Sequence, residues 1–190
     1  MCKICCIILN YNDAKRTKQL AETVACYDSI DEVVIVDNAS TDDSSALLNS
    51  INNKKIEIIL SSKNGGYGAS VNKGFDIATG EYISIIESDD FIKSNMFEAM
   101  YNKAEKVNAE ILKTDFLLYY DDKERVTRRN NFKKNDYGRL IDPKENTHIF
   151  FADPSIWTAI YRKDFIEKNN IELIKSAKAT YSDTSFNFKV

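Results

Sequence analysis

Three carboxylates stand within four residues in the segment Glu87-Ser88-Asp89-Asp90. The segment follows Tyr82–Ile86, a β-branched and aromatic apolar run that is typical of a buried strand. Ligands of open α/β sheets bind at the carboxyl ends of the strands. Because uncompensated carboxylates this close repel one another, one explanation of the cluster is a divalent cation with hard oxygen ligands. The other is a helix N-cap, in which Asp89 or Asp90 caps a helix that begins near Ile92.

Polar residues also follow the other apolar runs in the first half of the chain. These strand-end segments are Asn10-Tyr11-Asn12-Asp13, Asp37-Asn38-Ala39-Ser40 and Asn64-Gly65-Gly66-Tyr67-Gly68. A parallel sheet brings the carboxyl ends of its strands to one edge, so we expect the four polar segments to meet there. Four separate helix caps would be a weaker explanation of the same pattern.

The elements that must position these residues alternate along the chain. We predict strands at 3–9, 32–36, 56–60, 82–86 and 111–120, and shorter strands at 149–152 and 156–161. We predict helices at 13–26, from a Ser40-Thr41-Asp42-Asp43 cap to about residue 51, and at 68–78, 94–107 and 163–169. This order predicts an α/β fold, a Rossmann-like and mostly parallel sheet flanked by helices on both faces.

The glycines of Gly66-x-Gly68 resemble half of a dinucleotide-binding fingerprint. That fingerprint follows the first strand of its fold, whereas these glycines follow the third, so the pattern does not favour NAD. The glycines still allow a ligand to approach the backbone closely. Asn72 and Lys73 lie about one turn into the predicted helix, where an amide and an ammonium group can reach a nucleotide.

Composition excludes several classes of protein. A net charge of −3 gives no electrostatic case for nucleic acid. No apolar run approaches the ~20 residues of a membrane span, and no signal peptide is recognisable, so we expect a cytoplasmic protein. Cys2 and Cys5 have no second ligand pair for zinc, and Cys5 and Cys6 fit a buried strand as small hydrophobic residues. The single histidine, His148, has no recognisable triad, so base chemistry would fall to a carboxylate.

The segment 121–138 is polar and basic. Within 123–134, six basic residues accompany one acidic residue, Glu124. Two interpretations stay open: a solvated hairpin or loop, and a site for phosphate or an anionic surface.

Five motifs in order resemble those of family 2 glycosyltransferases with the GT-A fold. They are Leu9-Asn10-Tyr11-Asn12; Val34-Ile35-Val36-Asp37-Asn38-Ala39-Ser40-Thr41-Asp42; Asn64-Gly65-Gly66 through Asn72-Lys73-Gly74; Ala78-Thr79-Gly80-Glu81-Tyr82-Ile83 into Glu87-Ser88-Asp89-Asp90; and Trp157 to Tyr161-Arg162-Lys163, followed by Tyr181-Ser182-Asp183-Thr184-Ser185-Phe186. The resemblance covers nearly the whole chain and is weakest over 121–147.

The resemblance implies an inverting transferase that uses a nucleotide-diphosphate sugar. Asp183 would be the catalytic base, Asp89 would bind Mn²⁺ or Mg²⁺, and Trp157 would wall the acceptor side. The implied nucleotide-sugar-binding residues are Asn10, Asn12, Asp37, Asn38, Gly65, Asn72, Lys73, Glu87 and Ser88. Without the resemblance, Asp183 reads as an N-cap of the last helix.

Two departures from the family pattern matter. Glu87 stands where the family usually has Asp, and its extra methylene shifts the carboxylate by about 1 Å, which puts metal binding in doubt. The chain ends seven residues after Asp183, whereas relatives usually continue, so we expect a C-terminally truncated catalytic core. A non-catalytic nucleotide-sugar-binding module is therefore an alternative. A sugar-nucleotide pyrophosphorylase fits less well, because the loop after the first strand has no glycine.

We therefore predict a single domain over 1–190, with a nucleotide-sugar-binding half (1–120) and an acceptor-side half (121–190). The resemblance implies a glycan or lipid-linked acceptor, a role in polysaccharide biosynthesis, and peripheral contact with the inner face of the membrane. The residues leave open the nucleotide, the sugar and the oligomeric state.

Overall fold

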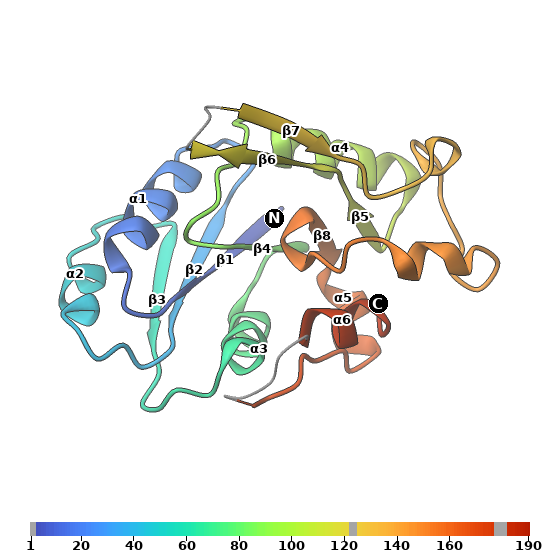
Figure 1. Cartoon of the computed structure of the whole chain (residues 1–190). Coiled ribbons are helices and arrows are strands. Elements are labelled where there is room, and N and C mark those ends of the chain that lie inside the picture. The colour runs from blue at the N-terminus through green and yellow to red at the C-terminus, as the bar shows by residue number, and fades with distance from the viewer. Residues whose placement is uncertain (1–2, 122–124, 177–181) are drawn as a thin grey trace.

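A six-stranded mixed sheet forms the centre of the protein, in the order β3-β2-β1-β4-β8-β5 (Figure 1). The computed structural model describes residues 3–121, 125–176 and 182–190. The strands are β1 (Ile4–Asn10), β2 (Glu32–Asp37), β3 (Ile56–Leu60), β4 (Tyr82–Ile86), β5 (Ile111–Lys113) and β8 (Ala159–Arg162). The first four are parallel, and β8 runs antiparallel to both β4 and β5. The predicted α/β class and mostly parallel sheet are confirmed.

Helices cover both faces of this sheet, because successive strand residues point to opposite sides. The helices are α1 (Ala14–Ala25), α2 (Ser44–Asn49), α3 (Tyr67–Ile77), α4 (Met96–Val107), α5 (Lys163–Lys168) and α6 (Ser182–Asn187). Ile4, Cys6 and Ile8 of β1 pack into the same core cluster as α1 and α4. Cys5 and Ile7 pack on the opposite face with α3, α5 and α6. Both cysteines of the strand are thus buried in apolar cores, as predicted.

The strand order reverses between β1 and β4. The chain moves outward from β1 through β2 to β3, and then returns to place β4 on the other side of β1. Connections on opposite sides of a sheet leave a crevice at the carboxyl ends of the two strands where the order reverses. Asn10 ends β1 and Glu87 follows β4, so these two polar segments border the crevice.

The single strand predicted at 111–120 is wrong. The chain instead forms β5 in the main sheet and β6 (Phe116–Tyr120), which pairs with β7 (Arg125–Arg129) as a separate hairpin. Two sets of hydrogen bonds separate the two strands. The backbone N–H of Thr114 donates to the Thr158 carbonyl. The Asp115 carboxylate accepts from the side chains of Arg128 and Tyr137 and from the Asn131 backbone N–H. These tertiary hydrogen bonds turn the chain out of the sheet.

Other local predictions also need correction. The strand predicted at 149–152 lies in a 3₁₀ helix (Thr147–Phe151), and the one at 156–161 is a 3₁₀ turn (Ile156–Thr158) followed by β8. The predicted cap at Ser40 is wrong, because α2 begins at Ser44 and the Ser40 hydroxyl bonds to Asp37. A further 3₁₀ turn spans Lys134–Asp136.

The two predicted halves share one sheet, since β8 of the second half lies between β4 and β5 of the first. In the parts of the chain that the structure describes, no helix is long and apolar enough to span a membrane.

Candidate functional site

A buried network of hydrogen bonds joins the ends of β1 and β2. The Asn10 side-chain amide donates to Asp37 at 2.6 Å and to the Ser40 hydroxyl at 3.1 Å. Ser40 in turn donates to Asp37 from its hydroxyl at 2.5 Å and from its backbone N–H at 3.0 Å. Asp37 thus accepts three hydrogen bonds. A carboxylate can accept about four, so Asp37 can still accept one hydrogen bond from an N–H group of a ligand.

Asn12 lies above this network. Its backbone N–H donates to the Ser40 hydroxyl at 2.8 Å, and its side-chain oxygen accepts from the Thr41 backbone at 2.8 Å. Asn12 and Ala39 both adopt positive φ, at 55° and 60°. A non-glycine residue is uncommon in this conformation, and such residues gather at binding sites where the surrounding contacts hold them.

Asn38 ties the end of β2 to the glycine-containing loop. Its side-chain nitrogen donates to Asn64 at 3.0 Å, and its oxygen accepts from the Gly65 backbone N–H at 3.0 Å. Gly66 then starts α3 with a φ of 83°, a conformation that glycine adopts at low cost. Asn38 and Gly65 therefore shape the edge of the crevice.

Asn72 and Lys73 lie in different surroundings. The Asn72 side chain is buried, donating to the Leu173 carbonyl and accepting from the Leu173 N–H, both at 2.9 Å. Through these two bonds Asn72 holds segment 171–174 against α3, and a direct ligand contact would have to replace them. Lys73 is exposed, and its ammonium group donates to the Ser61 hydroxyl at 2.8 Å. The Ser61 backbone N–H donates to the Asp37 carbonyl, so Lys73 lies on the same side of the crevice as the end of β2.

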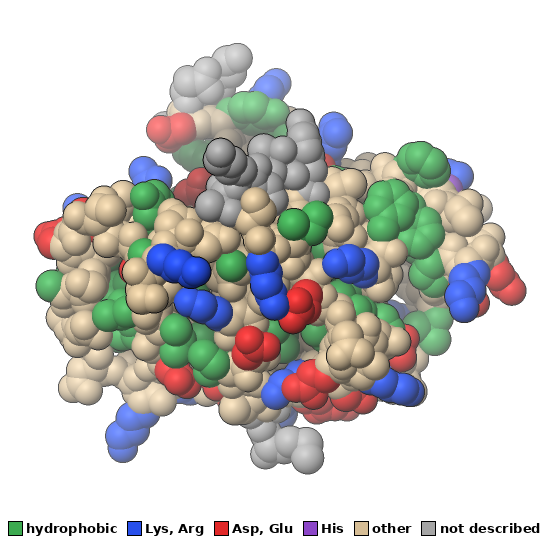
Figure 2. Space-filling model, turned by 90° about the horizontal axis from the view of Figure 1, so that it is seen from below, with side chains coloured by type: hydrophobic (Ala, Val, Ile, Leu, Met, Phe, Trp, Pro, Cys, Tyr) green, Lys and Arg blue, Asp and Glu red, His purple; other side chains and the backbone are tan. Residues whose placement is uncertain are grey.

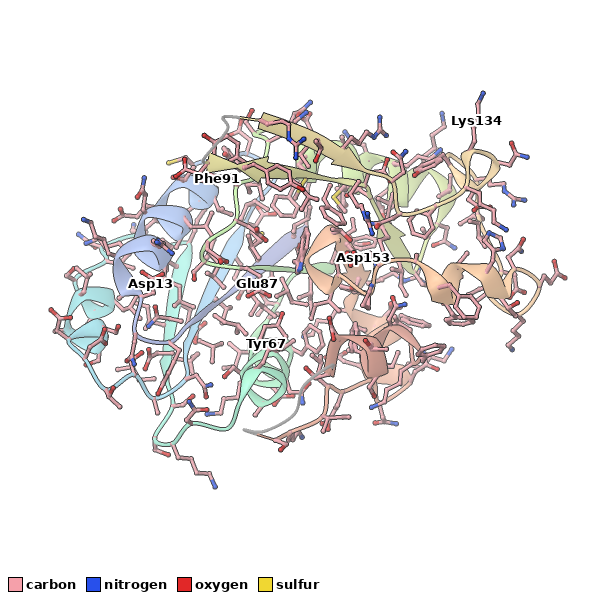
Figure 3. The ribbon with its side chains drawn as sticks, viewed as in Figure 1. Asp13, Tyr67, Glu87, Phe91, Lys134 and Asp153 are labelled. Carbon is pink, nitrogen blue, oxygen red and sulfur yellow. The ribbon has the colours of Figure 1, made fainter. Side chains whose placement is uncertain are left out.

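The acidic segment after β4 turns at the crevice. Glu87 accepts a short hydrogen bond from the Tyr67 hydroxyl of α3, and the two side chains lie together in Figure 3. Burial raises the pKa of Glu87, and the charges of Asp90, Asp89 and Asp183 raise it further, while the Tyr67 hydrogen bond opposes the rise. Burial also raises the pKa of Asp90, with a contribution from Asp89. Ser88 is half-buried and Asp89 is exposed, so the Asp89 carboxylate is accessible to a cation.

We expect Glu87→Gln to stabilise the protein at neutral pH. The raised pKa means that folding favours the protonated form, so the stability of the wild type falls as pH rises from 4.5 through the folded-state pKa. Glutamine can keep the bond from Tyr67 without the charge. We expect Tm at pH 7.5 to rise by about 2–4 °C, which corresponds to about 1 kcal/mol. The difference should shrink as pH is lowered towards 4.5, and the same change at the exposed Glu57 should show neither effect. A lower Tm at pH 7.5 would contradict the repulsion argument.

Asp183 lies in the first turn of α6, within electrostatic reach of the acidic segment. It contributes to the raised pKa values of Glu87 and Tyr67. Its carboxylate accepts from the Thr184 backbone N–H at 2.8 Å, and it lies inside the helix and not at its cap. The structure therefore brings Asp183 towards the acids that follow β4, although the two segments are far apart in sequence.

A lysine completes this side of the crevice. Lys113, at the end of β5, donates to the Asp153 carbonyl at 2.7 Å. Burial lowers its pKa to about 8, and the charges of Asp153 and Asp183 partly oppose that shift. The Lys113 ammonium group is therefore within electrostatic reach of the Asp153 and Asp183 carboxylates; Asp153 is labelled in Figure 3.

Trp157 lies on the adjoining 3₁₀ turn. Its ring packs edge-on against Phe116 of β6, with 4.8 Å between ring centroids. This contact joins the predicted acceptor wall to the base of the β6–β7 hairpin.

The carboxylates after β4 fit a cation in one respect. Their mutual repulsion is what a positive ion would relieve. Across the residues that the structure describes, however, no group of three His, Cys, Asp or Glu side chains is arranged to hold a metal. Magnesium is commonly bound through one or two carboxylates and the phosphates of a substrate, so one accessible acid such as Asp89 is sufficient.

Three residues of the site were not assigned from the sequence. Tyr67 lies inside the glycine segment, Ser40 is predicted as a helix cap, and Lys113 lies near the start of the predicted strand 111–120. Only Tyr67 has a signal in the sequence: it is a tyrosine at the start of a helix, directly after a glycine turn that follows a strand.

The family model for glycosyl transferase family 2 matches residues 5–169. The chain belongs to glycosyl transferase family 2. Among curated relatives, a cholesterol galactosyltransferase of Borreliella burgdorferi is 28% identical over 181 residues, covering 89% of this chain and 50% of that protein. The glycosyltransferase GlyG of Streptococcus pneumoniae is 29% identical over 113 residues, covering 57% of this chain and 37% of that protein.

Solved structures agree on the fold of this family 2 chain. The crystal structure of S. aureus TarS 1–349 in complex with UDP-GlcNAc superposes with a TM-score of 0.78 at 22% identity, covering 98% of this chain and 52% of that one. The predicted GT-A fold is therefore confirmed. This chain spans about half or less of the length of the relatives described above.

Proposed function

We propose that this family 2 chain transfers a sugar from a nucleotide-diphosphate donor to a hydroxyl group of a glycan or lipid-linked acceptor, with inversion. The observation that carries the proposal is the approach of Asp183 to the acids after β4, at the point where the strand order reverses. A general base and an accessible cation ligand would then face one crevice, as displacement of a diphosphate requires.

The nucleotide would lie over the ends of β1 and β2. Asp37, pre-oriented by Asn10 and Ser40, would accept a hydrogen bond from the base. Asn12 and Lys73 would flank the nucleotide, and Asn38, Gly65 and Asn72 would hold the surrounding backbone.

The diphosphate would lie near Glu87, Ser88 and Asp89. A bound Mn²⁺ or Mg²⁺ held by Asp89 would stabilise the negative charge that develops on the leaving diphosphate. Tyr67 would keep the Glu87 carboxylate oriented towards the ribose or the cation's waters.

The acceptor would enter beside Trp157. Its hydroxyl oxygen would attack the anomeric carbon while Asp183 takes the hydroxyl proton, and the bond to the diphosphate breaks with its electron pair leaving on the diphosphate. Attack from the side opposite the leaving group inverts the anomeric centre. Lys113 would hold the segment around Asp153 next to Asp183.

A second candidate is a nucleotide-sugar-binding module without catalysis. The hydrogen bond from Tyr67, which occupies the Glu87 carboxylate, favours it. Release of nucleotide diphosphate from the donor distinguishes the two candidates. Polysaccharide biosynthesis and a cytoplasmic location stay predictions.

The test of donor binding is thermal stability against UDP, dTDP, GDP and CDP, each with and without Mn²⁺. UDP is the first choice, since one structural neighbour holds UDP-GlcNAc. A nucleotide at ~100 times its Kd should stabilise the fold by roughly 2.7 kcal/mol. Asp37→Asn should lose the shift, and the exposed Asp43→Asn should retain it. No shift from any nucleotide would overturn the proposal for this chain.

A further inference from the structure

Lys113 and Asp153 form a second pair of charged side chains near Asp183. The charge of Asp183 raises the pKa of Glu87. It also opposes the fall in the pKa of Lys113, as does the charge of Asp153. Asp183 therefore adjoins the acids after β4 and also the pair formed by Lys113 and Asp153. Glu87 and Asp153 are both labelled in Figure 3. The proposed mechanism leaves the Asp153 carboxylate without a role.

The loop that carries Asp153 is held at both ends. The Lys113 ammonium group donates to the Asp153 carbonyl at 2.7 Å. At the other end, the backbone N–H and the hydroxyl of Thr114 donate to the Thr158 carbonyl at 2.9 and 3.1 Å. Trp157 lies in the same loop and is half-buried. Asp153 and Trp157 are therefore presented in fixed positions, as a binding site requires.

Both charged side chains keep capacity for a ligand. Asp153 is half-buried, and its Oδ1 accepts from the Ser155 backbone N–H at 3.1 Å. Among the residues that the structure describes, Asp153 Oδ2 accepts no hydrogen bond. An ammonium group has three N–H donors, and Lys113 uses one of them on the Asp153 carbonyl. Within the same part of the chain, the pair thus offers one carboxylate oxygen and further N–H donors that protein groups leave unused.

The acceptor of the proposed reaction has to approach from the side of this pair. A general base must be within hydrogen-bond reach of the proton that it takes. In an inverting transfer the acceptor hydroxyl attacks opposite the leaving diphosphate, whose proposed place is beside Glu87 and Asp89. The hydroxyl therefore meets Asp183 from the side where Lys113 and Asp153 lie. This step rests on the proposed function.

We propose that Asp153 and Lys113 bind the hydroxyl groups next to the one that reacts, so that the acceptor group is a sugar with adjacent free hydroxyls. The carboxylate accepts from a hydroxyl, and the ammonium group donates to a hydroxyl oxygen. The Trp157 ring offers an apolar surface to the C–H face of the sugar. A simple alcohol has only its reacting hydroxyl. It would leave both charged groups without partners when it covers them, which is unfavourable.

Individual groups carry this recognition, and a broad charged surface does not. On the face seen in Figure 2, basic and acidic side chains are interspersed. An ionic acceptor would find no surface of a single charge there to attract it. Neutral hydroxyl groups fit a site that contains one cation and one anion better than an acceptor of either charge.

The test is the binding of methyl glycosides by saturation-transfer NMR, with and without UDP and Mn²⁺. The probes are the methyl glycosides of glucose, galactose, N-acetylglucosamine and rhamnose, and 1-butanol is the simple alcohol. We expect at least one glycoside to bind and 1-butanol not to bind. Because binding is measured without turnover, the result does not depend on transfer.

Asp153→Asn should weaken glycoside binding at least about tenfold, the loss expected for a hydrogen bond to a charged group. Asparagine keeps the shape of the side chain and an oxygen for the Ser155 N–H, so the loop should be preserved. The matched control is Asp142→Asn. Asp142 is exposed and accepts from the Lys144 N–H, two residues further on, at 2.9 Å, as Asp153 does from Ser155. The control should leave glycoside binding unchanged.

Lys113 gives an independent measurement. Lys113→Met should also weaken glycoside binding, and Lys113→Arg should restore part of it, because arginine keeps the charge and the N–H donors. A role confined to packing would make the two variants equal.

Full glycoside binding in Asp153→Asn, equal loss in Asp142→Asn, or binding of 1-butanol without any glycoside would overturn the proposal. So would the absence of glycoside binding under both conditions, and a thermal shift with UDP would then show that the donor site alone survives. Glycoside binding without transfer from any donor would instead refute the proposed function and leave this sugar site standing.

Discussion

Asp183→Asn should slow the release of nucleotide diphosphate from the preferred donor by about 10²–10⁴-fold, the usual contribution of a general base. Asparagine keeps the shape of the side chain and its bond to the Thr184 N–H, so α6 should be preserved. The nucleotide contacts proposed at Asp37 lie elsewhere in the crevice, so the thermal shift with nucleotide should stay near the wild-type value.

Donor hydrolysis is the appropriate assay, because water can replace the acceptor hydroxyl. The matched control is Asp76→Asn, the same substitution at an exposed carboxylate on α3, and it should leave the rate unchanged. A wild-type rate in Asp183→Asn would reduce Asp183 to a structural residue of α6 and favour the binding module.

The parts of the fold that sequence predicted well are those where burial alone decides the local structure. β1, β2 and β4 are apolar runs covered on both faces, and their predicted ranges differ from the observed ones by one residue or less at each end. An apolar strand with no polar interruption has few alternatives once it is covered by helices.

The mistakes arose where tertiary hydrogen bonds override local preference. Nothing in the run 111–120 signals that Asp115 accepts four hydrogen bonds from a segment further along the chain. Asn72, predicted to contact the nucleotide sugar, likewise has a structural partner that the sequence does not reveal. Its partner is the backbone of Leu173, a residue that only the folded chain brings near.

The candidate site shows the same division. The acids after β4 and the Asn10–Asp37 end of the sheet could be predicted because parallel strands place their carboxyl ends together. The Tyr67–Glu87 bond and the approach of Asp183 to Lys113 depend on how α3, α6 and β5 pack, which periodicity does not encode.

Asp89→Asn should remove the metal-dependent part of nucleotide binding and slow donor hydrolysis by about 10²–10³-fold. Stabilisation of a leaving diphosphate by a cation is worth several kcal/mol, and each 1.36 kcal/mol is a factor of about ten in rate. Asp89 is the exposed acid of its segment, while Glu87 is occupied by Tyr67. The measurement is the thermal shift with UDP as Mn²⁺ is titrated, followed by the hydrolysis rate under the same conditions.

The neighbouring Asp90→Asn is the matched control, because it removes the same charge from the same turn. Asp90 is half-buried and its pKa is raised by burial, so it is less suited to stay ionised beside a solvent-accessible cation. We therefore expect Asp90→Asn to keep the Mn²⁺ dependence and most of the rate. Loss of the dependence in Asp90→Asn and its retention in Asp89→Asn would move the cation to Asp90. Retention in both variants would mean that the diphosphate is stabilised without a metal. The positive charge would then have to come from a side chain, and Lys113 is a candidate because it lies within electrostatic reach of Asp183.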